Sequence, residues 1–541
     1  MRLLRTVVVF GSLGLLPGCV DGGTTSADAG TESTTEAETD DASSDGSSSD
    51  ATTGSGSETD VGTTAEPVPV EPIHARGLLV TDVLADQGVS VPIGMGGLPV
   101  GGADRNAYLV ANRSTLIRAF VDIVEDDSWV AREIEARITL NYDDGTSESA
   151  KKVLLIERDS VINNWDSTFF WYIPPELIRA GMSFSIELFE LDQALVDTPE
   201  PSPPPLFPTE GIAYVGIEDS YGALDIALVP VQHDLNGKTC GPPEFDDAFL
   251  ERMHNDLMAQ NPVERVDITV LEPLVFTQGM KSFGPLLSAL SQLRGDYDAP
   301  PQQYFYGLVI PCDGGAEGVG GQAFGIPQGA TKSNAYQRVA MGRFYGSDSS
   351  TASTFTHEIG HTQGRYHIAC SGSEGGTDDS YPYPGGTTGV YGFDIFYWNL
   401  HTPNQKDYMT YCGPTWVSDW AWNKVHPVIQ ALSAWEGEGD VAPPSGTLLV
   451  GALYDDGSEE WWTTPGNLEG ERLSTIHALE FKTAEGVVRA PASYNQRPDD
   501  TTINVVVELP TSLDEITAAT RLSDAGAHPI ALPTIKRLAR R

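Results

Sequence analysis

Basic residues and long apolar runs are scarce in this chain of 541 residues. Lysine and arginine together number 32, against 76 aspartates and glutamates, and the formal net charge is −44. The sequence has no basic stripe that could neutralise phosphates, so we expect no nucleic-acid partner. No apolar run after the N-terminal segment is long enough for a transmembrane helix, so we expect no helix that crosses a membrane.

The N-terminal segment has the pattern of an export signal. A short basic start is followed by an apolar run of about ten residues and then by Leu16, Pro17, Gly18 and Cys19. A run of this length suits a signal peptide, here residues 1–18, and is too short to span a bilayer. The four closing residues resemble a bacterial lipobox, which implies cleavage before Cys19 and a lipid on that cysteine. The chain would then be a bacterial surface or outer-membrane lipoprotein, and a soluble secreted protein is the alternative.

Residues 19–68 lack the side chains that a folded core requires. Between Asp21 and Glu66 there is no lysine, arginine or aromatic residue, and Ser, Thr, Gly, Ala, Asp and Glu make up nearly all of the segment. Such a composition cannot bury enough apolar surface to fold. We therefore expect a disordered acidic stalk that holds the folded domains away from the membrane.

Histidine is also rare, with 10 in the whole chain, yet three of them lie in the segment HEIGHTQGRYH. In a helix, His357 and His361 stand one turn apart on one face, so both can bind one metal ion. Glu358 lies beside the first ligand and can reach a water on the metal. Gly364 allows a left-handed turn that brings His367 round as the third ligand. Three protein ligands with one open position indicate a catalytic zinc site, and the alternative is a helix that merely contains histidines.

The pattern HExxHxxGxxH resembles the metzincin metalloendopeptidases. Members of that clan also have a methionine turn beneath the metal, and Met409 in the segment Asp407–Tyr411 matches it. Met409 would pack under the imidazoles without coordinating the ion. Tyr411 matches the position at which astacins and serralysins place a tyrosine near the metal.

This resemblance implies a zinc endopeptidase that hydrolyses peptide bonds of extracellular proteins or glycoproteins. Glu358 would activate a zinc-bound water, and Tyr411 would help to stabilise the oxyanion. Two alternatives stay open. One is a surface adhesin or glycan-binding lipoprotein with a vestigial protease fold, and the other is a zinc hydrolase with a non-peptide substrate.

Four cysteines follow Cys19, and an even number in an exported chain predicts two disulfides. Cys370 follows the third ligand and Cys412 follows the methionine turn, so a shared metal would bring these two together. Cys240 and Cys312 each follow an expected strand, residues 223–231 and 304–310, and in a metzincin these strands would be neighbours in a parallel sheet. An inhibitory role of Cys240, similar to the cysteine switch of matrix metalloproteases, is the alternative.

The remaining pattern predicts a multidomain α+β protein. Alternating apolar residues in Glu133–Tyr142 indicate a β-sandwich-like domain over residues 69–205. Strands and helices alternate over residues 206–440, where the resemblance implies a metzincin-like catalytic domain with a mixed sheet and a zinc helix. Strand signals return in residues 441–541 and predict a second β-domain.

Two further segments are candidates for binding. Residues 320–325 lie where metzincins carry the edge strand above the cleft, and their backbone would pair with an extended substrate. The alternative for this segment is a plain glycine-rich loop. Asp378 and Asp379 are candidates for a calcium site, although paired aspartates in a loop are usually solvated.

Overall fold

The computed structural model describes residues 72–124, 128–195, 197–346, 348–372, 375–436, 446–498 and 501–537. These residues belong to one compact unit, Val70–Arg541. The expected signal peptide and the whole expected acidic stalk, with Cys19, lie outside the described residues.

The described part of the chain is mostly β-sheet, with 39% of its residues in strands and 18% in helices. The described residues form four α-helices: α1 (Asp247–Ala259), α2 (Gly284–Asp296), α3 (Asp348–Thr362) and α4 (Asp419–Ala434). The expected multidomain α+β class, with a metzincin-like mixed sheet and zinc helix, is therefore wrong. The helices expected within residues 206–440 are present, but short strands and loops occupy most of the described residues between them.

Two sheets pack face to face in the N-terminal part of the described chain. One has the order β1 (Ile73–His74), β10 (Ser183–Glu190), β7 (Arg132–Asn141) and β8 (Ser147–Ile156), with β11 (Leu206–Phe207) and β12 (Ala213–Tyr214) also on β10. The other has the order β4 (Leu98–Pro99), β3 (Ser90–Met95), β2 (Leu78–Asp86), β6 (Thr115–Ile123) and β9 (Phe169–Ile173). Ile138 and Ile186 of the first sheet and Val83 and Ile117 of the second lie in one buried core. The alternation expected in residues 133–142 thus marks a strand with one buried face.

The central sheet has the order β15 (Lys238–Cys240), β14 (Ala223–Leu235), β18 (Tyr304–Val309), β20 (Val339–Arg343) and β19 (Gly321–Ala323). Strands β16 (Arg265–Val270) and β17 (Leu274–Phe276) also pair with β14. Strands β14, β18 and β20 are parallel, which confirms the expected pairing of residues 223–231 with 304–310. Strand β19 ends the path and runs antiparallel to β20.

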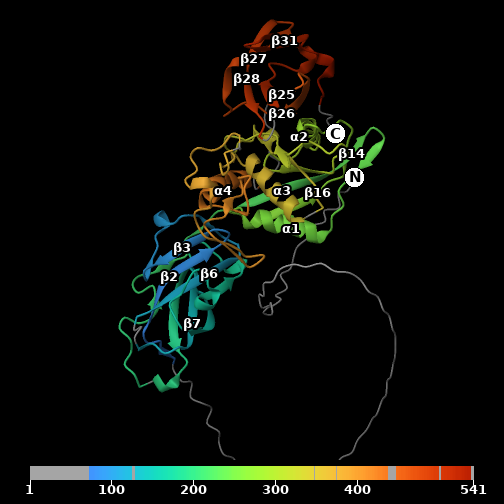
Figure 1. Ribbon diagram of the computed structural model, residues 1–541. Coiled ribbons are helices and arrows are strands. Elements are labelled where there is room, and N and C mark those ends of the chain that lie inside the picture. Colours follow the sequence, from blue (N-terminus) through green and yellow to red (C-terminus); the bar gives the residue numbers. More distant parts are fainter. Residues whose placement is uncertain are drawn as a thin grey trace, which may run out of the picture. The chain divides into compact units, whose positions relative to one another are not determined.

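Helices cover both faces of the central sheet (Figure 1). Leu224, Ile226 and Leu228 of β14 share a core with α1, α3 and α4. The alternate residues Ala227 and Val229 share another core with α2. Burial of both faces explains why β14 reads as a nearly continuous apolar run.

Short strand pairs complete the region: β5 (Leu109–Val110) with β13 (Ile217–Glu218), β21 (Gly392–Asp394) with β22 (Asn399–His401), and β23 (Lys406–Asp407) with β24 (Thr415–Trp416). They lie in long connections whose sequences show little helical or strand periodicity. The β21–β22 pair precedes the expected methionine turn, and β23 and β24 lie on either side of it, so backbone hydrogen bonds order a loop-rich segment there.

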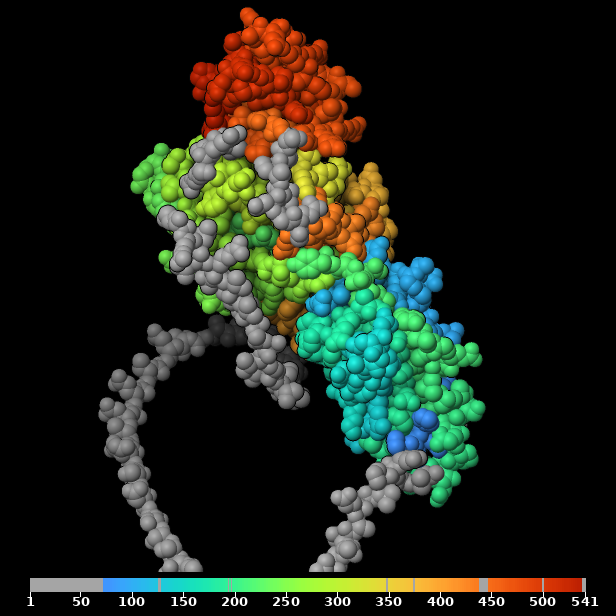
Figure 2. Space-filling model, turned by 180° about the vertical axis from the view of Figure 1, so that it is seen from behind, coloured from blue at the N-terminus to red at the C-terminus, as the bar shows by residue number. Residues whose placement is uncertain are grey.

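The C-terminal sheet has the order β26 (Glu459–Pro465), β25 (Thr447–Leu453), β29 (Ile503–Glu508), β28 (Gly486–Gln496), β27 (Leu473–Thr483), β30 (Ala518–Ser523) and β31 (Gly526–Ile530). It forms the compact orange-to-red region of Figure 2. All of its neighbouring strands are antiparallel. Within the described residues, no helix is both long and apolar enough to span a bilayer.

Candidate metal centre

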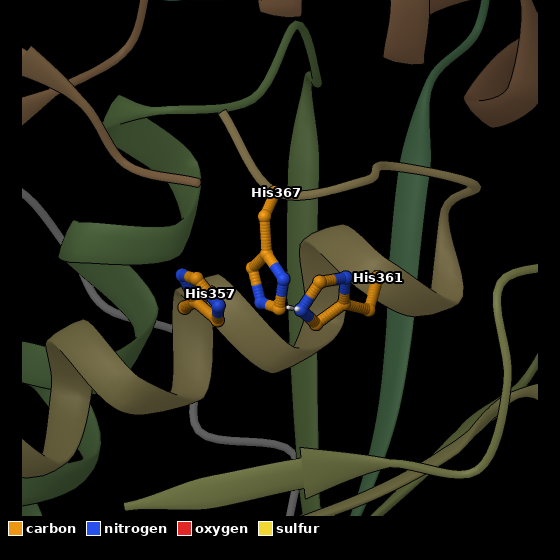
Figure 3. Close-up of side chains that lie close together, drawn as sticks. All are labelled: His357, His361 and His367. Carbon is orange, nitrogen blue, oxygen red and sulfur yellow. Dashed lines mark hydrogen bonds between the residues drawn. The ribbon is translucent and has the colours of Figure 1, made fainter. Parts of the chain in front are cut away.

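Helix α3 and the turn that follows it bring three histidines together. The buried residues Phe355 and Ile359 anchor α3 in the core that it shares with the sheet. His357 and His361 lie one turn apart on α3, and His367 reaches them from the next segment (Figure 3). One nitrogen of each ring lies within 4.8 Å of the others, which forms the single group of this kind found in the described chain. The three histidines could therefore hold one metal ion.

Gly364 ends the helix as the sequence predicts. Its φ of +87° is left-handed, and the amide of Arg365 donates to the carbonyl of Gly360 at 3.0 Å. This pattern is a Schellman cap, which strongly favours glycine. The turn reverses the chain after α3 and lets His367 face the two helical histidines.

Backbone carbonyls orient all three rings. The Nδ1 atoms of His357, His361 and His367 lie 2.8, 2.7 and 2.8 Å from the carbonyl oxygens of Tyr408, Arg365 and Gly375. Because a carbonyl can only accept, each Nδ1 must carry its hydrogen. A ring held in this way presents an unprotonated Nε2 when it is neutral, and the Nε2 atoms of His361 and His367 lie 3.1 Å apart. Converging lone pairs of this kind fit a metal cation, and the carbonyls act as the outer partners that fix metal-binding histidines.

Glu358 lies next to this group and against the edge strand β19. Glu358 is buried, with 3% of its surface exposed. A Cβ atom added to Gly321 would lie 2.7 Å from both the Cγ and the Oε1 atoms of Glu358. The glycine backbone therefore passes directly over the carboxyl group, a close approach that the sequence did not reveal.

The segment Asp407–Tyr411 passes beneath α3. Met409 is fully buried, and its Sδ atom would lie 2.5 Å from a Cβ added to Gly360, which stands between the two helical histidines. The carboxyl group of Asp407, which sequence reasoning missed, accepts hydrogen bonds from the Met409 amide at 3.0 Å and from the Ser418 hydroxyl at 2.5 Å. Burial raises the pKa of the Asp407 carboxyl, against the lowering effect of these hydrogen bonds. An aspartate two residues before the methionine was the available signal for this turn.

Tyr411 reaches the centre from the same segment. Its hydroxyl oxygen lies 3.0 Å from the Nε2 atom of His367, and the residue is 55% exposed. The phenol is thus near the ligand nitrogens on a side that is open to solvent. A tyrosine in this place can contact a bound substrate as well as the ligand set.

Both expected disulfides are present. Cys370 is bonded to Cys412, and Cys240 is bonded to Cys312. The first bond joins the segment after His367 to the segment after Tyr411. The second removes the free thiol that a cysteine switch at Cys240 would require.

The calcium candidates do not form a comparable cluster. The carboxylate of Asp378 accepts hydrogen bonds from the amide and hydroxyl groups of Ser380 at 3.0 and 2.6 Å. It therefore stabilises its own turn. Neither Asp378 nor Asp379 belongs to the metal-binding group found in the described chain.

Comparison with known proteins adds no assignment. No protein-family model matches the chain, and no curated protein matches it significantly. The chemistry of the centre therefore has to be judged from its own ligands, hydrogen bonds and surroundings.

Proposed function

We propose that this protein is a zinc-dependent endopeptidase, related in its motif to the metzincins, that hydrolyses peptide bonds of extracellular proteins. The observation that carries the proposal is the convergence of three imidazoles with Nδ1 atoms fixed by carbonyls, beside a buried glutamate. A metal site that served only structure would normally have four protein ligands. Here three histidines leave one position for substrate or water.

The ligand set favours zinc over harder cations. Imidazole nitrogens suit zinc and other late transition metals, whereas calcium and magnesium prefer oxygen. A zinc ion held by His357, His361 and His367 supplies Lewis acidity, which polarises a carbonyl and makes water more acidic.

The protein groups around the ion carry out the proton transfer, the stabilisation of the oxyanion and the binding of the substrate. Glu358 takes a proton from the attacking water and delivers it to the leaving amine as the carbon–nitrogen bond breaks. The hydroxyl of Tyr411 donates a hydrogen bond to the developing oxyanion. We propose that an extended substrate backbone pairs with the edge of β19 that faces away from β20, the only strand that pairs with β19 among the described residues.

Two variants and one control test this proposal on the purified mature chain with casein and a peptide library. Glu358→Gln should keep about one zinc per chain and lose roughly 100- to 10,000-fold in turnover. His367→Ala should lose both zinc and activity, because a ligand is missing. Glu251→Gln, an exposed change on α1, should match the wild type. Wild-type turnover by Glu358→Gln would refute the mechanism, and a zinc-loaded but inactive wild type would favour an adhesin with a vestigial protease fold.

The disulfides indicate folding in an oxidising, extracellular environment. We further propose that a lipid on Cys19 holds the protein at a bacterial surface. The lipobox-like segment and the acidic stalk after it support this anchoring. The substrates would then be proteins or glycoproteins that reach the cell surface.

A further inference from the structure

One segment of the central region, residues 321–338, touches the candidate centre at two places, and we call it the wall segment. At its start, Gly321 packs on Glu358. Further along, the Pro327 carbonyl oxygen would lie 2.8 Å from a Cβ added to Gly364, at the turn that delivers His367. The wall segment therefore touches the candidate base at its start and, further along, the turn that precedes the third histidine.

The same segment is bound on another side by the C-terminal β-region, residues 446–537. The side-chain Nδ2 of Asn504 donates to the Phe324 carbonyl at 2.7 Å, and the side-chain Nε2 of Gln322 donates to the Pro498 carbonyl at 3.2 Å. The Phe324 ring also meets the buried Trp462 edge to face, with centroids 6.0 Å apart. Polar and apolar contacts thus hold the strand β19 and the residue that follows it.

More contacts continue along the wall segment. The side-chain Nε2 of Gln337 donates to the Glu471 carboxylate at 2.9 Å, and the hydroxyl of Ser333 donates to the Glu469 carbonyl at 3.3 Å. The C-terminal β-region therefore binds the wall segment along most of its length.

Arg497 determines how Asn504 is oriented. Its Nε atom donates to the Oδ1 atom of Asn504 at 2.8 Å, and its Nη1 atom donates to the Gly284 carbonyl at 2.9 Å. Arginine can only donate, so the asparagine oxygen must face it and the Nδ2 group must face Phe324. Arg497 is 2% exposed and Asn504 is 5% exposed, so this network is shielded from water. Hydrogen bonds in such surroundings are strong and costly to break.

Strand β29 has two buried faces with different partners. Val506, on the same face as Asn504, lies in the core that contains α2 and Phe324. Val505 and Val507 point the other way, into the core of the C-terminal sheet itself. One face of β29 therefore packs in the core of the C-terminal sheet, and the other packs against the central region that contains the candidate site.

We propose that the C-terminal β-region is a working part of the peptidase, with Asn504 and Arg497 as positioning residues that hold the substrate-pairing strand β19 beside Glu358. This role rests on the proposed peptidase function and extends it. Without the network, β19 separates from α3, extended substrates bind less tightly, and the carboxyl group of Glu358 loses its neighbour. Metal binding stays intact, because no ligand or carbonyl partner of a ligand belongs to the C-terminal β-region.

The test uses the full mature chain with Asn504→Leu, a change of similar size that removes both hydrogen bonds. For peptides of eight or more residues we expect kcat/KM to fall about tenfold, mainly through a higher KM. Zinc content should stay at the wild-type level. Amide hydrogen exchange should become faster in residues 319–326 and stay unchanged in α3. The matched control Val507→Ala, which weakens only the core of the C-terminal sheet, should lower thermal stability and leave KM unchanged.

Asn504→Asp provides a second variant if Asn504→Leu does not fold. It keeps the acceptor for Arg497 but places a carboxylate oxygen against the Phe324 carbonyl, where two acceptors repel each other, so it should show the same exchange pattern and at least as large a rise in KM. Wild-type exchange in residues 319–326 together with wild-type KM in both variants would overturn the positioning role. The exchange measurement needs no activity, so it tests the positioning even if the protein proves not to be a peptidase.

Discussion

Gly321→Ala is the sharpest perturbation that the structure offers near Glu358. The new Cβ atom would lie 2.7 Å from the Cγ and Oε1 atoms of Glu358 and from the Cγ2 atom of Thr354. Ordinary van der Waals contact begins at about 3.4 Å, so strand and helix must separate by roughly 0.7 Å. A displacement approaching 1 Å at a reacting group can cost about 100-fold in rate. We therefore expect kcat on a fluorogenic peptide to fall by about 100-fold, with zinc content unchanged.

The neighbouring glycine provides a matched control. A Cβ atom added to Gly320 would meet the hydroxyl oxygen of Tyr345 at 2.7 Å, but that side chain is 48% exposed and can move aside. Neither glycine has a positive φ, so alanine imposes no backbone strain at either position. Gly320→Ala should lower kcat by less than about threefold. Equal kcat values for the two variants would show that β19 does not position Glu358.

Three further changes test separate features. Tyr411→Phe removes a hydroxyl that lies 3.0 Å from His367, and it should lower kcat by about ten- to a thousandfold with zinc content and KM unchanged. An unchanged kcat would remove Tyr411 from the catalytic residues. Cys19→Ser should move the protein from the detergent phase to the aqueous phase in a lipoprotein-competent bacterium, whereas a fully aqueous wild type would contradict lipidation. Burial raises the pKa of Asp86 from 3.8 to about 6, so its contribution to stability is present below pH 4 and is lost as the pH rises through 6. Asp86→Asn should remove this pH dependence, which amounts to roughly 3 kcal/mol of unfolding free energy. Urea midpoints measured between pH 4 and 7 test this, and an identical change of midpoint with pH in the variant and the wild type would refute it.

The histidine group could be predicted from the sequence because local geometry governs it. Helical spacing places His357 and His361 on one face, and the glycine cap at Gly364 directs the chain that carries His367. The disulfide between Cys370 and Cys412 followed from the convergence of two segments on one metal. In each case the residues are close in sequence or were expected to meet at one metal ion.

The fold class could not be predicted in the same way. The alternation of strands and helices expected in residues 206–440 includes α1 and α2, but it suggested an α+β class for a protein whose described residues are mostly in sheets. The two flanking β-regions and the short strands near the methionine turn make the described residues mostly β. The sequence pattern of a helix or strand therefore predicts that helix or strand, whereas the proportion of helix to strand depends on the whole chain.

The contacts that organise the site were hidden for a chemical reason. The three histidines donate to the carbonyls of Tyr408, Arg365 and Gly375, and Asn504 donates to the carbonyl of Phe324. Every residue has a backbone carbonyl, so the identity of the acceptor residue gives no sign of its role. Asn504 and Phe324 are also 180 positions apart, beyond the reach of any local pattern. A sequence can thus identify candidate metal ligands by their side chains, whereas the groups that fix those side chains and the strand beside them become visible only when the backbone is folded.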